Sequence, residues 1–541
     1  MKKFSILALV CAMTTATLWA VPARRTGQVV TQPDGSQITI YQHGDEHFHW
    51  MTNEEGEWLR LDEDGFYHIT EALDKTEIQA KRMASPKRVT YKATPLNIAP
   101  RGLVILVNYT DVAFETEKAE MDSMLIGKNY TRDYSYTYRG KTYEITSQGS
   151  ARQYFEDASF GQYNLQLDVV GPVTVSKNMA YYGGNNSYGS DKYPEVMVKE
   201  ACELVDDSVD FSLYDNNDDG YVDFVYVIYA GYGEADGGGA NTIWPHAWYL
   251  YSAAGRRCEL DGKIIDLYAC GNELDFYSKN HTGIGTFCHE FSHVLGLPDL
   301  YDTEQTHKQK TLGMWSILDY GPYNNDGNTP PMYSAYERFF MRWLTPRLIT
   351  EPENIVLEEL NSSQTALLVT TTDQHNLIGN DPNPTKFYML ENRQQEGWDE
   401  YLPGHGLMLT YVQYSYNKWL QNTVNNTAKS MGIDLIEADG RAPISSQNGY
   451  DGKATDLFPA GATEYTQIAD HPILGIQEVE GTISFVYRDT IKTSVEDVEI
   501  SDQVVAIYNI LGQKQPTNDV SALPGGTYIV VSTNGKRKII R

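Results

Sequence analysis

The chain has 541 residues, with 43 Lys and Arg against 72 Asp and Glu, and a formal net charge of −29. Such a balance disfavours binding to the phosphates of nucleic acids and to anionic membrane surfaces. Hydrophobic residues make up 41% of the chain and aromatic residues 12%, which excludes a globally disordered protein. The length indicates about three to four structural units.

The first segment is typical of an export signal. Two lysines precede an apolar run over residues 4–20, and small residues follow at Ala20 and Ala23. This pattern predicts a bacterial signal peptide over residues 1–23, cleaved after Ala20 or after Ala23. The alternative is a membrane anchor, but the run is at the short limit for a span of about 20 residues. We therefore expect a protein that is secreted or held at the cell surface, with no membrane span in its mature form.

Residues 24–95 are expected to form a small β-rich pro-segment. Strand-like runs such as Ile38–Tyr41 alternate there with turn pairs such as Asp34-Gly35. The segment ends in a polar, basic stretch over residues 81–88, which is typical of a linker open to proteolysis.

Residues 96–350 alternate strand and helix patterns, which predicts an α/β domain. In chain order the expected elements are strand Leu103–Val107, helix Ala151–Ala158, strand Leu165–Val170, helix Pro194–Val205, strand Val222–Tyr229 and helices Ile284–Leu295 and Met332–Trp343. Short β runs return over residues 351–490 as a β-rich continuation of this unit. The tail, residues 491–541, carries two further strand-like runs, Val504–Ile510 and Thr527–Val531, of a C-terminal β-sandwich domain.

Four cysteines remain after the signal peptide, at Cys202, Cys258, Cys270 and Cys288. Four cysteines allow three pairings, and the sequence does not choose among them. We favour a Cys258–Cys270 disulfide, because Asp261-Gly262 between them reads as a hairpin turn that would set the two side by side. Four free thiols are the alternative.

The stretch from His289 to Asp299 reads His-Glu-Phe-Ser-His-Val-Leu-Gly-Leu-Pro-Asp. On a helix, His289 and His293 lie one turn apart on the same face and can present two imidazole nitrogens to one metal ion. Glu290 projects beside that ion, where it can take a proton from a bound water. Gly296 permits a left-handed end to the helix and a proline follows, so the chain must turn sharply. Two imidazoles, one carboxylate and an open position for water fit Zn²⁺.

Two carboxylates compete for the third position of this predicted zinc site. Asp299 follows His293 after the glycine that can reverse the chain, whereas Glu337 lies on the later predicted helix. Asp302 is a third choice. We favour Asp299, because a helix that ends at Gly296 allows the chain to double back and bring this carboxylate to the two histidines.

Several motifs around this stretch resemble one family. They are Cys288–Asp302, Gly313–Gly321, Ala335–Arg338, Arg342–Leu344, Glu391–Gln394, Gly397–Asp399 and Pro403–Gly406. Together they resemble the M6 family of secreted metallopeptidases, the immune inhibitor A type, and more loosely the metzincins. The resemblance covers roughly residues 96–460. It implies an α/β (α+β) metzincin-like catalytic domain, flanked by a β-rich pro-segment and C-terminal β-sandwich modules.

One segment departs from the metzincin pattern. Ser316–Tyr320 resembles the Met-turn that floors the zinc site, but Leu318 stands at the methionine position. A Leu-for-Met exchange conserves volume and usually costs less than about 1.5 kcal/mol. Tyr320 falls where some metzincins place a tyrosine over the zinc, so the resemblance makes it a candidate to stabilise the oxyanion. A packed core tyrosine is the alternative.

A second candidate metal site, for Ca²⁺, lies at Asp215, Asn217, Asp219 and Asp223. These residues stand at positions one, three, five and nine of a loop with Gly220 at six, as in an EF-hand. Position twelve is Tyr226 rather than a bidentate glutamate, and a strand follows where a helix should. An ordinary Asx-rich turn is therefore the alternative.

The end of the chain carries a different set of motifs, Val505–Lys514, Leu523–Val530 and the basic Lys536–Arg541. They resemble the C-terminal sorting domain of the type IX secretion system of Bacteroidota. The resemblance implies a partner in that secretion machinery. A plain terminal β module is the alternative.

These features predict a secreted zinc-dependent endopeptidase, made as a zymogen, that cleaves extracellular proteins with Glu290 as general base. Strand Val222–Tyr229 is expected to offer an edge along which an extended substrate pairs. Because the pro-segment has no cysteine, latency requires a carboxylate, a histidine, the new α-amino group or burial of the cleft. The alternative function is a catalytically silent surface binding or adhesion protein on a metallopeptidase scaffold.

Overall fold

A computed structural model describes most of the chain. The described residues are 21–46, 48–62, 64–73, 99–186, 189–251, 257–304, 311–441, 452–488, 504–509, 513–519, 522–523, 528–532 and 537–540. The apolar run of the predicted signal peptide, the basic stretch over 81–88 and parts of the tail motifs lie outside these residues. The chain divides into two compact units, Met1–Arg488 and Asp489–Arg541.

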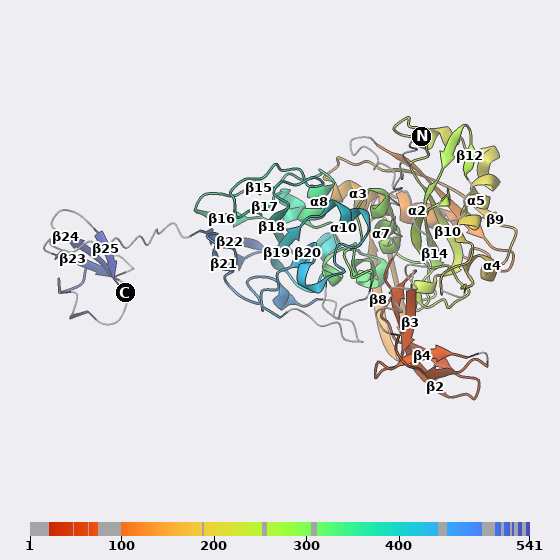
Figure 1. Ribbon diagram of the computed structural model, residues 1–541, viewed down its shortest axis with the longest axis horizontal. Coiled ribbons are helices and arrows are strands. Elements are labelled where there is room, and N and C mark those ends of the chain that lie inside the picture. Colours follow the sequence, from red (N-terminus) through yellow and green to blue (C-terminus); the bar gives the residue numbers. More distant parts are fainter. Residues whose placement is uncertain are drawn as a thin grey trace, which may run out of the picture. The chain divides into compact units, whose positions relative to one another are not determined.

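A five-stranded sheet with the order β11-β14-β10-β6-β9 organises the first unit (Figure 1). Its strands are β6 (Arg101–Asn108), β9 (Gln166–Thr174), β10 (Val225–Tyr232), β11 (His246–Tyr249) and β14 (Leu267–Leu274). All neighbours run parallel except β11, which pairs antiparallel with β14 at one edge. The continuous apolar sequences of β6 and β10 are what parallel strands covered on both faces require.

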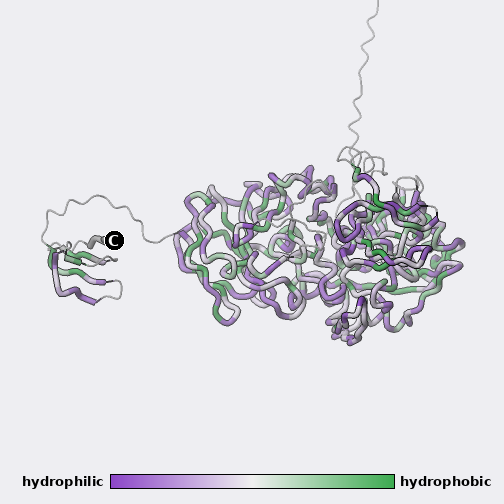
Figure 2. The backbone as a smooth tube through the Cα atoms, turned by 90° about the horizontal axis from the view of Figure 1, so that it is seen from below, coloured by the Kyte–Doolittle hydropathy of each residue, from purple (hydrophilic) through white to green (hydrophobic). Residues whose placement is uncertain are grey.

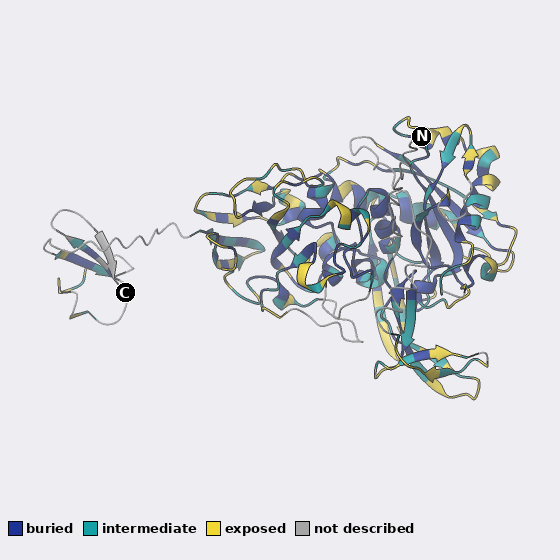
Figure 3. Cartoon of the chain, viewed as in Figure 1, coloured by how far each residue is buried: buried dark blue, intermediate teal, exposed yellow. Residues whose placement is uncertain are grey.

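Alternate residues of the central strands face two separate cores. On one face, Val104 and Leu106 pack with helices α2 (Lys118–Ile126), α3 (Ala151–Ala158) and α7 (Gly285–Val294). On the other face, Leu103 and Ile105 pack with α4 (Met179–Gly183) and α5 (Pro194–Val205). Figure 3 shows the central strands as buried throughout. The three layers confirm the predicted α/β class.

The local sequence signals fix most helix ends. Helices α3 and α5 begin and end at the predicted residues, and α7 is one residue shorter at each end than predicted. Helix α8 covers only Ala335–Phe340, because Ser334 and Glu337 form a capping box at its start and Arg342 has a left-handed φ of 62° just after its end. The prediction of a longer helix there, Met332–Trp343, is therefore wrong at both ends.

The prediction that Val222–Tyr229 offers a free sheet edge is also wrong. Strand β10 lies in the middle of the sheet and pairs with β14 on one side and β6 on the other. Its apolar run reflects burial on both faces, which the sequence does not distinguish from an edge position. The edge strand beside helix α7 is β11.

The predicted Cys258–Cys270 disulfide is not formed. The hairpin turn at Asp261 exists, but it joins β12 (Cys258–Leu260) to β13 (Lys263–Ile265), so that Cys258 faces Ile265. Cys270 lies in a different sheet, in β14, where it pairs with His246 of the edge strand β11. All four described cysteines are buried free thiols, and burial raises the pKa of each of them.

Within the predicted pro-segment, residues 28–69 form an antiparallel meander of five strands in sequence order. The strands are β1 (Gln28–Thr31), β2 (Gln37–Asp45), β3 (Phe48–Thr52), β4 (Trp58–Leu61) and β5 (Tyr67–Ile69). The rings of Phe48, Trp50 and Trp58 pack against one another, and Trp50 of β3 stacks on Trp58 of β4 with their centroids 5.1 Å apart. The meander lies along the hairpin of β7 (Thr131–Tyr138) and β8 (Lys141–Gln148), where the Tyr138 hydroxyl donates to the carbonyl of Gly27 at 2.9 Å (Figure 1).

The β-rich continuation belongs to the same unit as the α/β layers. It contains β15 (Arg347–Leu348), β16 (Glu353–Leu357), α9 (Leu360–Ser363), β17 (Leu367–Val369), β18 (Lys386–Arg393), β19 (Gly406–Gln413), α10 (Tyr416–Leu420), β20 (Ile433–Leu435), β21 (Ile473–Val479) and β22 (Thr482–Tyr487). Its two sheets have the orders β15-β17-β18-β19-β20 and β16-β22-β21. Asp399 connects this region to the segment before helix α8. It forms an ion pair with buried Arg393 of β18 at 2.6 Å and accepts a hydrogen bond from the Met332 amide at 2.9 Å. Figure 2 shows hydrophobic and hydrophilic stretches alternating along this backbone.

The second unit, where it is described, is a three-stranded antiparallel sheet. Its strands are β23 (Val504–Asn509), β24 (Tyr528–Ser532) and β25 (Arg537–Ile540). Ile507, Tyr528 and Val530 form its small core. Across the described parts of both units, no helix combines the length and the apolar character needed to cross a membrane.

Candidate metal centre

Helix α7 presents His289, Glu290 and His293, and all three side chains are buried. The helix ends as the sequence predicts, because Gly296 has a left-handed φ of 93° and its amide donates to the carbonyl of His293. The chain then doubles back and brings buried Asp299 to the same place.

Three ligand atoms meet at one point beside the helix. His289 Nε2 lies 3.1 Å from His293 Nε2. Asp299 Oδ1 lies 3.2 Å from the first nitrogen and 3.4 Å from the second. Among the described residues this is the one group of three or more His, Cys, Asp or Glu side chains gathered closely enough to hold a metal ion.

Hydrogen bonds on the far side of each ring set the tautomers of the two histidines. His289 Nδ1 lies 2.7 Å from the carbonyl of Ile317, and His293 Nδ1 lies 2.8 Å from the carbonyl of Leu297. A carbonyl can only accept, so both Nδ1 atoms carry the proton and the Nε2 atoms of the neutral rings present lone pairs. Burial lowers the pKa of His293 and favours its neutral form. Two facing lone pairs at 3.1 Å need a cation to bridge them.

The spacing of the three atoms fits a zinc ion. Ligand atoms about 2.0–2.1 Å from a tetrahedral zinc ion lie about 3.3–3.4 Å from each other, and the observed separations are 3.1, 3.2 and 3.4 Å. Although burial opposes it, positive charge on His293 and His289 lowers the pKa of Asp299 to about 2, and a metal ion held between the neutral rings would supply the same positive charge. The carboxylate is therefore ionised at neutral pH, as a metal ligand must be.

Asn422 orients Asp299, and no sequence pattern marks this asparagine. Its Nδ2 donates to Asp299 Oδ2 at 2.6 Å, while its Oδ1 accepts the Asp299 amide at 2.7 Å. The first bond occupies Oδ2, and Oδ1 of the same carboxylate faces the histidines. Asn422 comes from the β-rich continuation, and the backbone carbonyl of the same residue accepts from Thr303.

The two competing carboxylates are engaged elsewhere. Glu337 Oε1 accepts from the Ser316 hydroxyl at 2.6 Å, and its Oε2 accepts the Ser334 amide at 2.5 Å. Asp302 Oδ1 accepts the amide of Glu304 at 3.1 Å. Neither belongs to the cluster of ligand atoms.

The Ser316–Tyr320 turn lies directly against the cluster. Ile317 supplies the carbonyl that His289 contacts. Leu318, at the position where a Met-turn has its methionine, is fully buried. Tyr320 is buried, but its ring is not enclosed by the core alone. The guanidinium of Arg25 lies 3.8 Å from the ring centroid.

The start of the described chain reaches Glu290, which the sequence did not predict. We call residues 21–25 the leader segment. The Val21 amide donates to Glu290 Oε1 at 2.9 Å. Trp244 Nε1 donates to the Val21 carbonyl at 2.9 Å, and the Tyr323 hydroxyl donates to the Pro22 carbonyl at 2.6 Å. The leader segment is thus bound at the candidate site by backbone hydrogen bonds.

In the loop that was predicted to bind calcium, candidate ligand oxygens accept hydrogen bonds from groups of the protein. Asp215 accepts from the Lys263 ammonium at 2.7 Å and from the Gly220 amide at 3.0 Å. Asn217 and Asp219 accept backbone amides within the loop. These bonds are those of an Asx-rich turn, and the calcium site stays a prediction.

Comparison with known proteins relates this region to one family. Residues 97–345 match the model of the immune inhibitor A peptidase M6 catalytic domain. The pre-pro-metalloprotease PrtV of Vibrio cholerae serotype O1 is 25% identical over 340 residues, covering 54% of this chain and 36% of the relative. Immune inhibitor A of Bacillus thuringiensis subsp. alesti is 28% identical over 271 residues, covering 44% of this chain and 39% of the relative. The matched part thus spans little more than a third of each relative.

Proposed function

We propose that this chain is a zinc-dependent endopeptidase acting on extracellular proteins, because residues 97–345 match the model of the immune inhibitor A peptidase M6 catalytic domain. The observation that carries the proposal is the convergence of His289, His293 and Asp299 beside Glu290. These three residues are the proposed zinc ligands, with a further position open to water. A bound zinc ion supplies Lewis acidity and lowers the pKa of a coordinated water.

Glu290 is the proposed general base and acid. It lies on the same helix as the two histidines, and its Oε1 is within hydrogen-bonding distance of the leader segment, where a peptide can therefore approach it. Its carboxylate accepts the proton of the attacking water and transfers it to the leaving amine. Tyr320 is the proposed stabiliser of the oxyanion, because its ring contacts the leader segment rather than core residues alone.

The proposed zymogen form follows from the same contacts. The leader segment keeps the site inactive by lying across Glu290 and covering Trp244. Cleavage after Ala20 makes the Val21 nitrogen the α-amino group of the mature chain, whereas cleavage after Ala23 removes it. The contact between Val21 and Glu290 favours cleavage after Ala20.

Export is part of the proposal. We propose that the signal peptide, predicted over residues 1–23, ends at Ala20, and that the second unit has a sorting role in which it engages secretion machinery. The support is the apolar run over residues 4–20 and the tail motifs in the sequence. The mature enzyme is then secreted or held at the cell surface.

The direct test is hydrolysis of casein by the full chain, before and after limited proteolysis, with and without a zinc chelator. We expect hydrolysis after proteolysis, loss of hydrolysis with the chelator, and recovery on adding zinc. Hydrolysis that persists in metal-free protein would reject zinc catalysis. Absence of hydrolysis in zinc-loaded, processed protein would instead favour the silent binding protein.

A further inference from the structure

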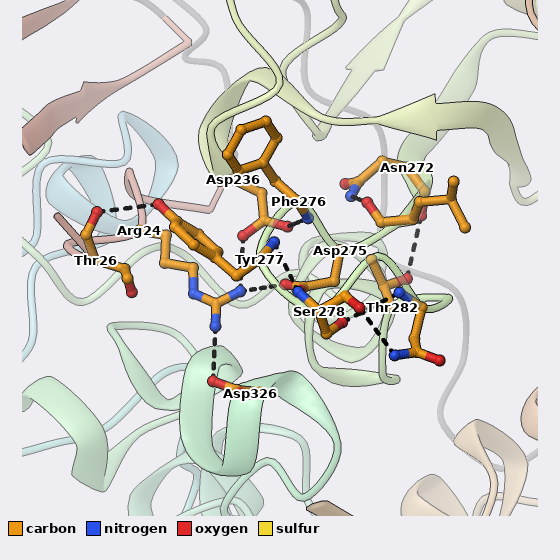
Figure 4. Close-up of polar contacts among 12 residues, drawn as sticks. Arg24, Thr26, Asp236, Asn272, Asp275, Phe276, Tyr277, Ser278, Thr282 and Asp326 are labelled. Atoms are coloured by element: carbon orange, nitrogen blue, oxygen red, sulfur yellow. Dashed lines mark hydrogen bonds and ion pairs between the residues drawn. The ribbon is translucent and has the colours of Figure 1, made fainter. Parts of the chain in front are cut away.

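Arg24 of the leader segment is buried in an acidic pocket (Figure 4). Its Nη1 donates to Asp236 Oδ1 at 2.9 Å and also to Asp275, and its Nη2 donates to Asp326 Oδ1 at 2.7 Å. The guanidinium lies 4.6 Å from the centroid of the Tyr277 ring. Only 7% of Arg24 is exposed, so the pocket encloses the side chain from several sides.

The residues that form the walls of this pocket all lie outside the leader segment. Asp236 follows β10, Asp275 follows β14, and Asp326 lies just beyond the Ser316–Tyr320 turn. Each carboxylate is held by a donor of the same domain: the Phe276 amide at 3.2 Å, the Ser278 amide at 2.6 Å and the Tyr136 hydroxyl, respectively. The pocket is therefore a feature of the enzyme, and Arg24 is its occupant.

The charge of the pocket exceeds what one arginine neutralises. Burial and the neighbouring Asp275 raise the pKa of Asp236 well above its ordinary value even with Arg24 in place. Although burial opposes it, Arg24 lowers the pKa of Asp275. When the leader segment departs, buried carboxylates are left facing each other, and another guanidinium is the group that compensates them best.

The pocket adjoins the residue that performs the chemistry. Val21, three residues before Arg24, contacts Glu290, and three residues of extended chain span at most about 10 Å. A small cavity of about 20 Å³, room for about one water molecule, is lined by Val21 and Arg24 together with Thr286 of helix α7. The leader segment thus nearly fills the space between Glu290 and the pocket.

We propose that Asp236, Asp275, Asp326 and Tyr277 form a substrate subsite that selects an arginine side chain near the scissile bond, and that Arg24 occupies it as a pseudo-substrate. This inference rests on the proposed peptidase function. Arginine is preferred to lysine, because two of its nitrogens reach different carboxylates while its plane stacks on Tyr277.

The test uses the full chain after limited proteolysis, carrying Arg24→Ala so that the pocket is vacated. The substrates are two peptides that differ only in arginine against citrulline, its neutral isostere. We expect kcat/KM to favour the arginine peptide by between about tenfold and a hundredfold. The ratio of the two values is independent of how much enzyme has been activated.

Asp326→Asn should bring this ratio close to one, and Asp236→Asn should lower it as well. With a third peptide that carries lysine at the same position, Tyr277→Leu should reduce the preference for arginine over lysine. Asp122→Asn is the matched control, because Asp122 pairs with Lys118 on the surface helix α2, and it should leave the ratio unchanged. Thermal unfolding checks that each variant is folded.

Equal cleavage of both peptides would overturn the subsite and leave a pocket that serves only to hold the leader. A high ratio that survives both Asp326→Asn and Asp236→Asn would also overturn it, because the selectivity would lie elsewhere. Failure to cleave either peptide, or casein, would overturn the proposed function, and this inference with it.

Discussion

The backbone nitrogen of Val21 donates a hydrogen bond to Glu290 Oε1 over 2.9 Å, although 269 positions separate them in the sequence. The proposed general base is therefore in contact with the chain's own leader segment. Trp244 fixes this arrangement from the other side, since its indole nitrogen donates to the Val21 carbonyl. Any peptide substrate that is to reach Glu290 must displace this segment.

Weakening the leader contact should raise the basal activity of the unprocessed chain. Trp244→Phe keeps a ring beside His49, which stacks on Trp244 at 5.0 Å, but leaves the buried Val21 carbonyl without this donor. Such a loss costs about 1–3 kcal/mol, so we expect a several-fold to hundredfold rise in casein hydrolysis. Trp398→Phe, which removes a donor to Asp157, is the control. A chain beginning near residue 96 that folds but is no more active than the longer chain would contradict inhibition by this region.

Glu290→Gln should lower kcat by about a hundredfold to ten-thousandfold, because the amide cannot accept the proton of the attacking water. Zinc content should stay near one ion per chain, since the three proposed ligands are untouched. Peptide hydrolysis and elemental analysis of the same sample measure the two quantities. Full activity in this variant would refute the mechanism.

Asp299→Ala should lose most of its zinc on dialysis, because a three-residue site loses one of its ligands. Asn422→Ala should weaken zinc binding by about tenfold to a hundredfold, because the bond from Asn422 Nδ2 no longer orients the carboxylate. Glu337→Gln should keep its zinc, since Glu337 contacts Ser316 and Ser334. If Glu337→Gln released zinc and Asp299→Ala retained it, Glu337 would be the ligand.

The helical part of the site could be predicted because its determinants are local. The spacing of His289 and His293 and the glycine at position 296 define a helix, its polar face and its end within one short stretch. The same holds for α3 and α5, whose ends match the predicted residues.

The remaining parts could not be predicted because they depend on contacts distant in sequence. Asn422 reaches Asp299 from 123 positions away, and no pattern around Asn422 marks it. A central strand and an edge strand can both be continuously apolar, so the sequence alone could not predict that β10 lies in the middle of the sheet. Cys258 and Cys270 flank a real turn, but the strand after that turn ends before Cys270.

Calcium binding at the Asp215 loop is open to a direct measurement. A calcium ion there has to displace the Lys263 ammonium, which lies 2.7 Å from Asp215. We therefore expect affinity no tighter than the range of about 10⁻⁴–10⁻³ M found in extracellular modules. Lys263→Met should tighten binding, and bound calcium should raise the melting temperature. Calcium is titrated into the chelator-treated unchanged protein and into Lys263→Met. If neither protein shows heat of binding or a change in melting temperature, the loop is an Asx-rich turn.

The final prediction concerns pH and two histidines of the meander formed by β1 to β5. Burial lowers the pKa of His43 to about 4. Burial also opposes protonation of His49, but Glu234, 3.2 Å away, raises the pKa of His49 above its ordinary value. The two residues must therefore have opposite effects on stability as the pH changes.

The contribution of His49 is fully present below its unfolded pKa of about 6.5 and is lost as the pH rises through its raised folded pKa. The cost of His43 appears as the pH falls below about 6.5 and is complete near its folded pKa. Thermal unfolding should therefore show His49→Gln destabilised near pH 5–6 and little changed near pH 9, with about 1.4 kcal/mol for each unit of pKa shift. His43→Gln should be relatively stabilised near pH 5 and unchanged near pH 8, because it removes the penalty for protonation. Parallel pH profiles for the two variants would contradict the assignment of Glu234 as the partner that keeps His49 charged.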